Sequence, residues 1–463
     1  MSSSRVETAT LKPILWILVL SSLYGAVNGF VVPKPRNQRP TTGLPKVPIM
    51  PLTSNYRTSP TIATTSSSAT TTKTSTSLNA IVDTAVAVAS LSATAKLLSS
   101  IGIGAVASKK PGLLDGVAVG ALSRLTYWVF QPLFLLCSVS FTIAQTSRGK
   151  SSASGLPLWI MPLVALVQIG MGALLARLVG RVANLEEEEG YDVSMCTTFG
   201  NSGPLPLIFA DALFGPGITS DVTSCISFYL LAWSPLFWSF GPYLLGCGKP
   251  VEKADNESLG AQIMSTIKQF LSPPVVGCIA GLVVGSTPFL RDALVGGWAS
   301  PLYGAFRTLG GAYVPAAVLV LAGSLMGQKK PAAETSDDDD TDDDDKAAAK
   351  PTENKTASPK ALMTILTSRF VLAPVMSLLS VRFLDGLGWL GTGRSRAVLR
   401  FCLLMEGCMP PAQNSVIMLQ LENLPDRASK LAKTLALVYA IAVIPVTLLM
   451  SACLGISGIL QYD

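Results

Sequence analysis

The stretch RFCLLMEGCMPPAQNSVIMLQLENL, residues 400–424, is apolar over a length that could cross a bilayer, yet Pro410, Pro411 and Asn414 lie at its middle. Two adjacent prolines remove two backbone N–H donors and clash with the preceding helical turn, so a helix must break here. In lipid, such a break persists only where protein or water satisfies the freed backbone groups. Because broken spans usually line substrate sites, we expect this one to do so.

A second apolar stretch, YDVSMCTTFGNSGPLPLIFADALF at residues 191–214, is interrupted in the same way by residues 200–204 and by Pro206. A helix that restarts after a break offers backbone N–H groups and about half a positive charge, which suits a carboxylate. Asn201 and Asn414 stand beside the two breaks, and an amide can donate as well as accept. Each asparagine therefore either contacts a substrate or supports the broken backbone.

The composition indicates a polytopic membrane protein. Of 463 residues, 49% are hydrophobic and only 14% charged, and the mean hydropathy is +0.46. The net charge of +6 comes from scattered basic residues, so we expect no nucleic-acid partner. Histidine is absent and the eight cysteines form no CxxC pair, so the sequence predicts no catalytic residues, no metal site and no cofactor.

The first 80 residues are typical of targeting segments. Residues 1–29 have a basic start, a short apolar core and small residues before Phe30, as in a signal peptide; an extra membrane anchor is the alternative. Residues 30–80 contain no acidic residue in a Ser/Thr/Pro-rich background, which is typical of a transit peptide, and a disordered luminal tail is the alternative. The pair resembles the bipartite presequences of algae with plastids inside the endomembrane system.

Ten apolar runs follow in two blocks of five, which predicts an all-α polytopic protein with ten transmembrane helices. The first repeat covers residues 82–247, a polar linker residues 248–265 and the second repeat residues 266–460. The fourth and ninth runs are the proline-broken ones. Five spans per half make the second half inverted, so the two broken helices can meet near the membrane midplane. The ten runs lie roughly at 82–107, 116–144, 156–183, 191–214, 223–246, 267–290, 299–327, 361–385, 396–424 and 432–460.

The loops alternate in charge, which predicts the orientation. The more basic set should face the cytosol-equivalent compartment and contains Lys109, Lys110, Arg181, Lys249, Lys253, Lys329, Lys330, Arg427, Lys430 and Lys433. The other set contains Arg148, Lys150, Arg291, Arg394 and Arg396. An Asp-rich loop at residues 328–360 is either a plain solvated linker or a kinase acceptor or weak cation-binding segment.

Glu406 lies one turn before Pro410, inside the ninth run, where an ionisable group is costly unless it is functional. Burial favours the neutral form of a carboxyl, which makes Glu406 a proton-coupling candidate. The alternative is a structural ion pair with an arginine, for instance Arg124, Arg307, Arg369 or Arg382. We expect Tyr229, Trp233 and Trp238 to be interfacial belt residues, with contact to an aromatic substrate as the alternative.

Five ordered segments resemble the auxin efflux carrier superfamily, and its PIN-LIKES branch most. They are LSRLTYWVFQPLFLLCSVSFTI, GNSGPLPLIF, AYVPAAVLVLAGSL, SRFVLAP and LLMEGCMPPAQNSVIMLQL. The resemblance implies two inverted five-helix repeats with a scaffold and a transport domain, and indole-3-acetate as cargo. It places Asn201 and Pro206 in one crossover and Pro410, Pro411 and Asn414 in the other. Pro204 stands where the family has a second asparagine, and Glu406 where glutamine is frequent.

The expected function is therefore secondary transport of a small amphipathic organic anion across an intracellular membrane, either the plastid envelope or the endoplasmic reticulum. The alternatives are a sodium-coupled organic-anion symporter of the bile-acid type and a non-transporting receptor. The expected partners are a small organic carboxylate and the lipid bilayer, and a homodimer is left open. The candidate substrate-binding residues are Asn201, Pro204, Pro206, Pro410, Pro411 and Asn414.

Overall fold

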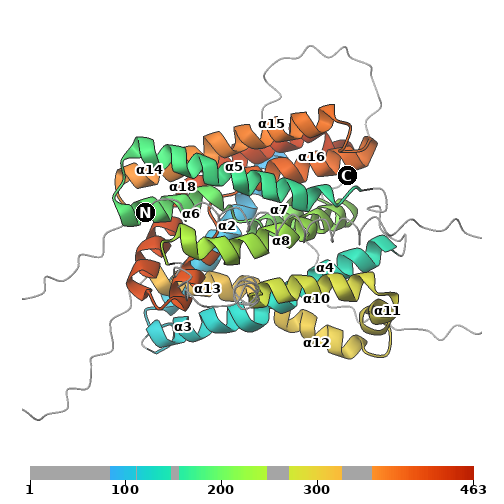
Figure 1. Cartoon of the computed structure of the whole chain (residues 1–463), viewed down its shortest axis with the longest axis horizontal. Helices are drawn as coiled ribbons and strands as arrows, with labels where there is room; N and C mark the ends of the chain where they lie inside the picture. The colour runs from blue at the N-terminus through green and yellow to red at the C-terminus, as the bar shows by residue number, and fades with distance from the viewer. Residues whose placement is uncertain (1–83, 111, 148–155, 248–270, 326–356, 463) are drawn as a thin grey trace, which may run out of the picture. The chain divides into compact units, whose positions relative to one another are not determined.

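The structure is a computed structural model that describes residues 84–110, 112–147, 156–247, 271–325 and 357–462 (Figure 1). The predicted leader, residues 1–80, lies outside the described residues, as do the whole polar linker and most of the Asp-rich loop. The described residues belong to one compact unit that begins at Ile81. They are helical and contain no β-strand. The expected all-α architecture is confirmed for this part of the chain.

The first half of the described chain comprises α2 (Thr84–Ala107), α3 (Gly116–Leu125), η1 (Thr126–Phe130), α4 (Gln131–Ser147), α5 (Ile160–Ala183), α6 (Glu187–Thr198), α7 (Pro204–Leu213) and α8 (Pro216–Leu244). The second half comprises α10 (Pro273–Ser286), α11 (Pro288–Gly296), α12 (Ser300–Gly311), α13 (Tyr313–Leu325), α14 (Pro359–Thr367), η3 (Ser368–Leu372), α15 (Ala373–Gly386), α16 (Gly393–Gly407), α17 (Asn414–Leu421), α18 (Pro425–Ser457) and η4 (Ile459–Tyr462).

Within the described residues, five helices are long and apolar enough to cross a membrane. A sixth is added if α10 and α11, which meet at 99°, count as one span. The helices on either side of the two predicted breaks, α6 with α7 and α16 with α17, are shorter, because each break divides one apolar run into two. The five spans are 116–147, 160–183, 300–325, 359–386 and 425–457. The multi-pass character is confirmed, while the count of ten and the inverted repeat stay predictions.

Proline sets several helix starts earlier than the apolar runs suggest. Helix α8 begins at Pro216 and not at 223, and α18 begins at Pro425 and not at 432. Proline is favoured in the first turn because its fixed φ suits a helix and its missing N–H has no partner there. The same effect splits the sixth run, where α10 ends at Ser286 and α11 begins at Pro288.

Two single turns of π-helix precede internal prolines. Turn η1 comes immediately before Gln131 and Pro132, and η3 carries Arg369 and is followed by Pro374. A proline inside a helix lacks the N–H that would bond four residues back, and a widened turn is one way to absorb this. Both widened turns bring a polar side chain, Gln131 or Arg369, into the interior of the protein.

Figure 1 separates the helices into two groups. The lower group contains α3, α4, α10, α12 and α13, and the upper group contains α5, α14, α15, α16 and α18, with α6, α7 and α8 between them. Within the lower group, Gly277, Gly281 and Gly285 of α10 lie directly against α4. Small residues at four-residue spacing allow two helices to approach closely, which is typical of packing in membranes.

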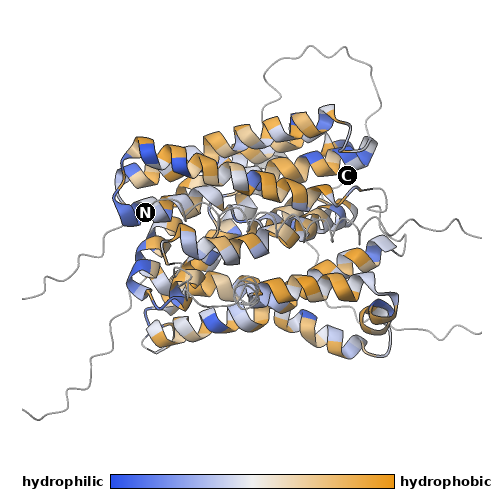
Figure 2. Ribbon diagram, viewed as in Figure 1, coloured by the Kyte–Doolittle hydropathy of each residue, from blue (hydrophilic) through white to orange (hydrophobic). Residues whose placement is uncertain are grey.

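Charged residues gather at the two ends of the bundle, whereas the middles of the helices are mostly hydrophobic (Figure 2). At one end, Arg427 of α18 donates to Asp192 of α6 at 2.8 Å and to the carbonyl of Leu245 after α8 at 2.6 Å. At the other end, Arg394 of α16 donates to Asp221 of α8 at 2.7 Å. The predicted separation of Arg427 from Arg394 into two loop sets therefore agrees with the fold.

Candidate functional site

The two interruptions meet, as the sequence predicts. Gly200 and Pro411 form an isolated antiparallel bridge. The Asn201 N–H donates to the carbonyl of Pro410 at 2.7 Å, and the Ala412 N–H donates to the carbonyl of Phe199 at 3.0 Å. Each broken helix thus satisfies backbone groups that the other leaves free. We call residues 199–203 and 408–413 together the crossover.

Asn201 also supports the crossover through its side chain. Its Nδ2 donates to the hydroxyl of Tyr439 on α18 at 2.7 Å, and that hydroxyl donates to the carbonyl of Pro411 at 2.8 Å. Tyr439 is 1% exposed and Asn201 is 2% exposed. This chain of hydrogen bonds ties both interruptions to α18, so the supporting role of Asn201 is a feature of the structure.

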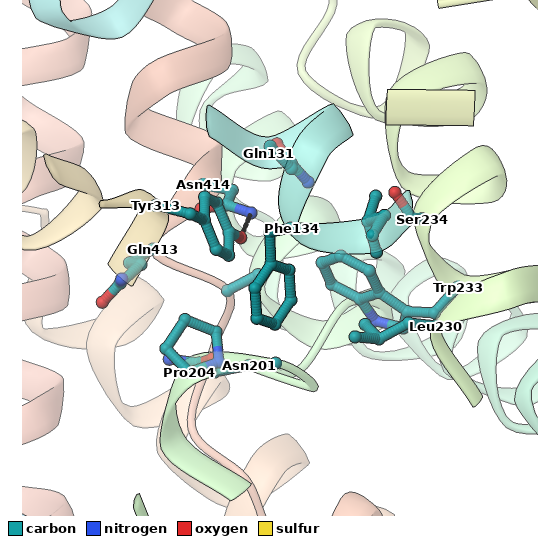
Figure 3. A pocket seen from close by; sticks show the side chains of 13 residues that line it. Gln131, Phe134, Asn201, Pro204, Leu230, Trp233, Ser234, Tyr313, Gln413 and Asn414 are labelled. Carbon is teal, nitrogen blue, oxygen red and sulfur yellow. Dashed lines mark hydrogen bonds between the residues drawn. The ribbon is translucent and has the colours of Figure 1, made fainter. Parts of the chain in front are cut away.

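A cavity with about 330 Å³ of empty space, which includes space open to the outside, lies on one side of the crossover (Figure 3). We call it the front cavity. It lies between α4 and α13 of the lower group and α8 with the crossover. Its lining consists of Gln131, Phe134, Leu135, Asn201, Gly203, Pro204, Leu230, Trp233, Ser234, Tyr313, Ala412, Gln413 and Asn414.

Several polar atoms of the front cavity are buried without a hydrogen-bond partner among the described residues. They are Oε1 of Gln131, Oγ of Ser234, both amide atoms of Gln413 and Oδ1 of Asn414. A buried polar group without a partner is costly, so such a cluster points to a ligand or to water. The lining side chains carry no formal charge and include three aromatic rings, so the cavity suits an amphipathic molecule.

Asn414 joins the crossover to the lower group. Its Nδ2 donates to the hydroxyl of Tyr313 on α13 at 2.6 Å, as the dashed line in Figure 3 shows. Towards the end of α17, Gln420 donates to Ser324 of α13 at 3.1 Å. These two hydrogen bonds join α17 to α13 of the lower group, and a third, between Ser138 of α4 and Ser227 of α8 at 2.6 Å, also leads out of the lower group.

A second cavity, the rear cavity, lies on the other side of the crossover and has about 490 Å³ of empty space, again including space open to the outside. Both carboxylate oxygens of Glu406 are buried here without a hydrogen-bond partner among the described residues, and the residue is 2% exposed. No direct ion pair joins Glu406 to Arg369, although both line this cavity. The lining consists of Gln168, Ile169, Met171, Gly172, Leu175, Thr197, Thr198, Gly200, Ser202, Tyr229, Trp233, Arg369, Ala373, Met376, Ser377, Glu406 and Gly407.

Arg369 holds the two interruptions together from the rear. Its Nη2 and Nε donate to the carbonyl of Met409 at 2.6 and 3.0 Å, and its Nη1 donates to the carbonyl of Thr197 at 3.3 Å. These carbonyls lie at the ends of α6 and α16, where the helix dipoles favour a positive charge. The guanidinium lies against Gly200, where a Cβ atom would overlap it.

The crossover is one extended segment thick, so its residues alternate between the cavities. Gly200 and Ser202 line the rear cavity, whereas Asn201 and Gly203 line the front cavity. This is the two-residue period of an extended chain. Trp233 of α8 borders both cavities. The two cavities are therefore separated by a single layer of backbone.

The structure distributes the predicted site residues over these features. Asn201, Pro204 and Asn414 line the front cavity, and Glu406 lines the rear one. Pro206, Pro410 and Pro411 are buried without lining either cavity. The carbonyls of Pro410 and Pro411 accept the hydrogen bonds described above. Because Pro204 and Pro206 carry no N–H, the first turn of α7 offers fewer backbone donors than a helix start usually does.

The expectation that Tyr229, Trp233 and Trp238 are interfacial belt residues is wrong. They are 3, 3 and 6% exposed, because α8 runs through the interior of the bundle and buries them. Gln131, Gln413 and Tyr313 were missed as site residues, since they reach the cavity from segments far apart in sequence. A polar amide within an apolar run is the one signal that could have indicated Gln131.

A multi-pass helical bundle with two broken helices that cross beside a polar cavity defines a membrane transporter and not an enzyme. Comparison with known proteins gives the family. Residues 89–450 match the model described as "Membrane transport protein", so the chain belongs to this family, which is of the auxin efflux carrier type.

The similar curated proteins are PIN-LIKES proteins of Arabidopsis thaliana. Protein PIN-LIKES 1 is 23% identical over 361 residues, which cover 69% of this chain and 70% of that protein. Protein PIN-LIKES 7 is 22% identical over 386 residues, which cover 72% of this chain and 89% of that protein. The similarity is low in identity and extends over most of the helical part of the chain.

Proposed function

We propose that the chain is a secondary carrier that moves a small amphipathic organic anion such as indole-3-acetate across an intracellular membrane. The observation that carries this proposal is the front cavity, where unpaired amide groups and aromatic rings meet beside the two helix starts of the crossover. Aromatic rings suit a planar apolar body, and the unpaired donors of the cavity, Nε2 of Gln413 and the hydroxyl of Ser234, suit a carboxylate. The starts of α7 and α17 add a positive potential on the same side.

The proposed architecture has ten spans in two inverted repeats, with the upper group moving as a unit past the lower group in an elevator-like manner. The directions of the helices support it. Gly277 of α10 lies beside Pro132 and Gly285 beside Ile143, so α10 and α4 run in the same direction. In a chain of ten passes, the second span, which contains α4, and the sixth span, which contains α10, must run in the same direction because both are even-numbered. Two hydrogen bonds from α17 to α13 are among the described polar links that such a movement breaks.

We place this carrier in the plastid envelope or the endoplasmic reticulum on the evidence of the leader sequence. A fusion of residues 1–80 to a fluorescent protein should enter the plastid of an alga with secondary plastids, whereas residues 1–29 alone should stop earlier in the secretory route. Reticular fluorescence from the longer fusion would instead favour the endoplasmic reticulum.

Flux measurements on the purified full chain in proteoliposomes test the proposal. A panel of radiolabelled indolic, aryl and short-chain carboxylates should identify at least one indolic or aryl acid that is taken up without sodium. Uptake that requires sodium would favour the bile-acid type of symporter. Binding without flux would favour a receptor, and either result would contradict the proposal.

A further inference from the structure

The rear cavity has no role in the function proposed above. It holds a buried carboxyl, Glu406, whose two oxygens have no partner among the described residues, and a buried guanidinium, Arg369, bonded only to backbone carbonyls. Arg369 therefore has no carboxylate in direct contact with its charge. The two side chains come from different helices, η3 and α16, and face one chamber.

The charge of the rear cavity depends on one proton. With Glu406 ionised, its charge and that of Arg369 cancel; with Glu406 protonated, the guanidinium leaves one positive charge directly behind the crossover. Gly200 and Ser202 border the rear cavity and Asn201 and Gly203 the front cavity, so only the crossover separates this charge from a substrate. Inside a protein such a charge is poorly screened.

We propose that Glu406 is a proton site that controls the affinity of the front cavity for an anion. A proton on Glu406 removes its negative charge, so that the positive charge of Arg369 is no longer offset. The inference rests on the proposed function, because it takes the ligand of the front cavity to be anionic. A proton on Glu406 raises the affinity for the anion. By linkage, a bound anion raises the affinity of Glu406 for the proton by the same factor. The carrier would then move a proton and an anion together.

Other ionisable groups near the pair are few among the described residues. Tyr229 of α8 faces Glu406, and Cys402 lies one turn back on the same helix. Helices α5 and α15 contribute Gln168 and Ser377, which do not titrate. The groups around Arg369 are Cys196 of α6, Cys408 after α16 and Tyr439 of α18. These neighbours are thiols and phenols, and Glu406 is the one carboxyl among the described residues that line the rear cavity.

Binding of radiolabelled indole-3-acetate to the purified full chain tests the inference between about pH 5.5 and 8, where the ligand stays largely ionised. The wild type should bind about tenfold more tightly at the acidic end, as expected for charges about 10 Å apart at an effective dielectric near 20. Glu406→Gln, which fixes the neutral form, should bind tightly at every pH. The neutral analogue indole-3-acetamide should show no pH dependence in either protein.

Asp211→Asn is the matched control, because Asp211 is an exposed acid on α7 and the substitution removes the same charge. This variant should keep the wild-type pH dependence. Wild-type affinity that does not change with pH, or a Glu406→Gln variant that keeps the slope, would overturn the inference while leaving the proposed function intact.

A measurement that needs no ligand separates the two claims. Infrared difference spectra of the ligand-free protein should show a protonated carboxyl that titrates with pH and is missing in Glu406→Gln. If indole-3-acetate fails to bind the wild type at any pH, the proposed substrate is wrong, and this infrared band still decides whether Glu406 is a proton site. A band absent from the wild type, or unchanged in the variant, would overturn it.

Discussion

Arg369 is the residue on which the crossover depends. Its guanidinium bonds the backbone on both interruptions, and it replaces backbone donors that the helices lose where they break. The arrangement requires that residue 200 have no side chain, because a Cβ atom there would overlap the guanidinium. Gly200 thus permits the buried guanidinium of Arg369 to lie against the crossover.

Gly200→Ala should destabilise the protein, because either the guanidinium or the crossover must move. We expect a loss of about 1–3 kcal/mol in the free energy of unfolding, which is typical of overpacking in a filled core. Gly203→Ala is the matched control, since its nearest neighbour, Leu230, would lie 4.0 Å from the new methyl group. Thermal unfolding of the two purified variants makes the comparison, and equal melting temperatures would contradict this account of Arg369.

Asn414→Ala and Asn201→Ala should differ in their effects. Both should weaken binding of the substrate by about 1–3 kcal/mol, roughly five- to 150-fold, because a buried partner is lost. Both should lower the melting temperature, because each amide donates to a buried tyrosine hydroxyl, and Asn201→Ala should lower it more, since Tyr439, the partner of Asn201, also bonds the carbonyl of Pro411 in the crossover. Equilibrium binding and thermal unfolding distinguish the two. If both variants bind carboxylates as the wild type does, the asparagines are structural and the site lies elsewhere.

The residues that sequence reasoning could reach are those whose chemistry conflicts with an apolar span. Prolines in a run that should be a helix located both breaks, and the position of Glu406 inside a span indicated its burial. Gln413 lies beside Asn414 inside the ninth run and carries the same signal as Gln131, whereas Tyr313, inside the seventh run, carries none. Their role comes from the contact between α13 and α17, which depends on how distant segments pack.

At the scale of the helices, the interface between the two groups is polar where α17 meets α13. Asn414 bonds Tyr313 and Gln420 bonds Ser324 across this interface. Hydrogen bonds between helices in membranes contribute modestly, so these contacts can be broken and reformed during a transport cycle. The helix boundaries themselves were less predictable, because prolines start α8 and α18 ahead of their apolar runs.

A cross-link between α13 and α17 should stop transport if the groups move past each other. Replacing Ser324 and Gln420 by cysteine puts thiols at two positions whose native side chains meet at 3.1 Å. Because a cysteine side chain is shorter than that of glutamine, a short bifunctional thiol reagent with a reducible spacer makes the link in place of a direct disulfide. Treatment with this reagent should abolish uptake, and a reductant should restore it.

The native pair Cys408 and Cys453 serves as the control. Their sulfurs are 3.7 Å apart, and they lie in the crossover and on α18, which Tyr439 already joins, so the same reagent should leave wild-type uptake unchanged. Full uptake by the cross-linked double variant would contradict the elevator-like movement.

At the scale of the whole described unit, the two ends of the bundle differ in charge. The end that holds Arg427 also holds Glu188, and Lys430 lies 3.5 Å from that carboxylate. The acids on this end therefore pair with some of its basic residues. Basic loops remain on the cytosol-equivalent side of a membrane during insertion, and acids influence this little.

Cysteines introduced at Lys110 and at Thr392 should react from opposite sides of the membrane, with Lys110→Cys accessible from the cytosol-equivalent side. Both positions are exposed and lie in loops between helices. The partly exposed native Cys247 is replaced by serine to lower the background. Labelling of both positions by an impermeant reagent from one side would contradict the predicted topology.

Counterflow of labelled indole-3-acetate in proteoliposomes tests the central claim most directly when it compares the wild type with a variant whose larger side chain fills the front cavity. Ser234 lines this cavity, and its hydroxyl has no partner among the described residues. The wild type should accumulate label against unlabelled substrate trapped inside the vesicles. Ser234→Phe should lower the melting temperature, because Ser234 is fully buried, but it should still unfold in one cooperative transition and should lose counterflow. Wild-type counterflow in Ser234→Phe would contradict the account.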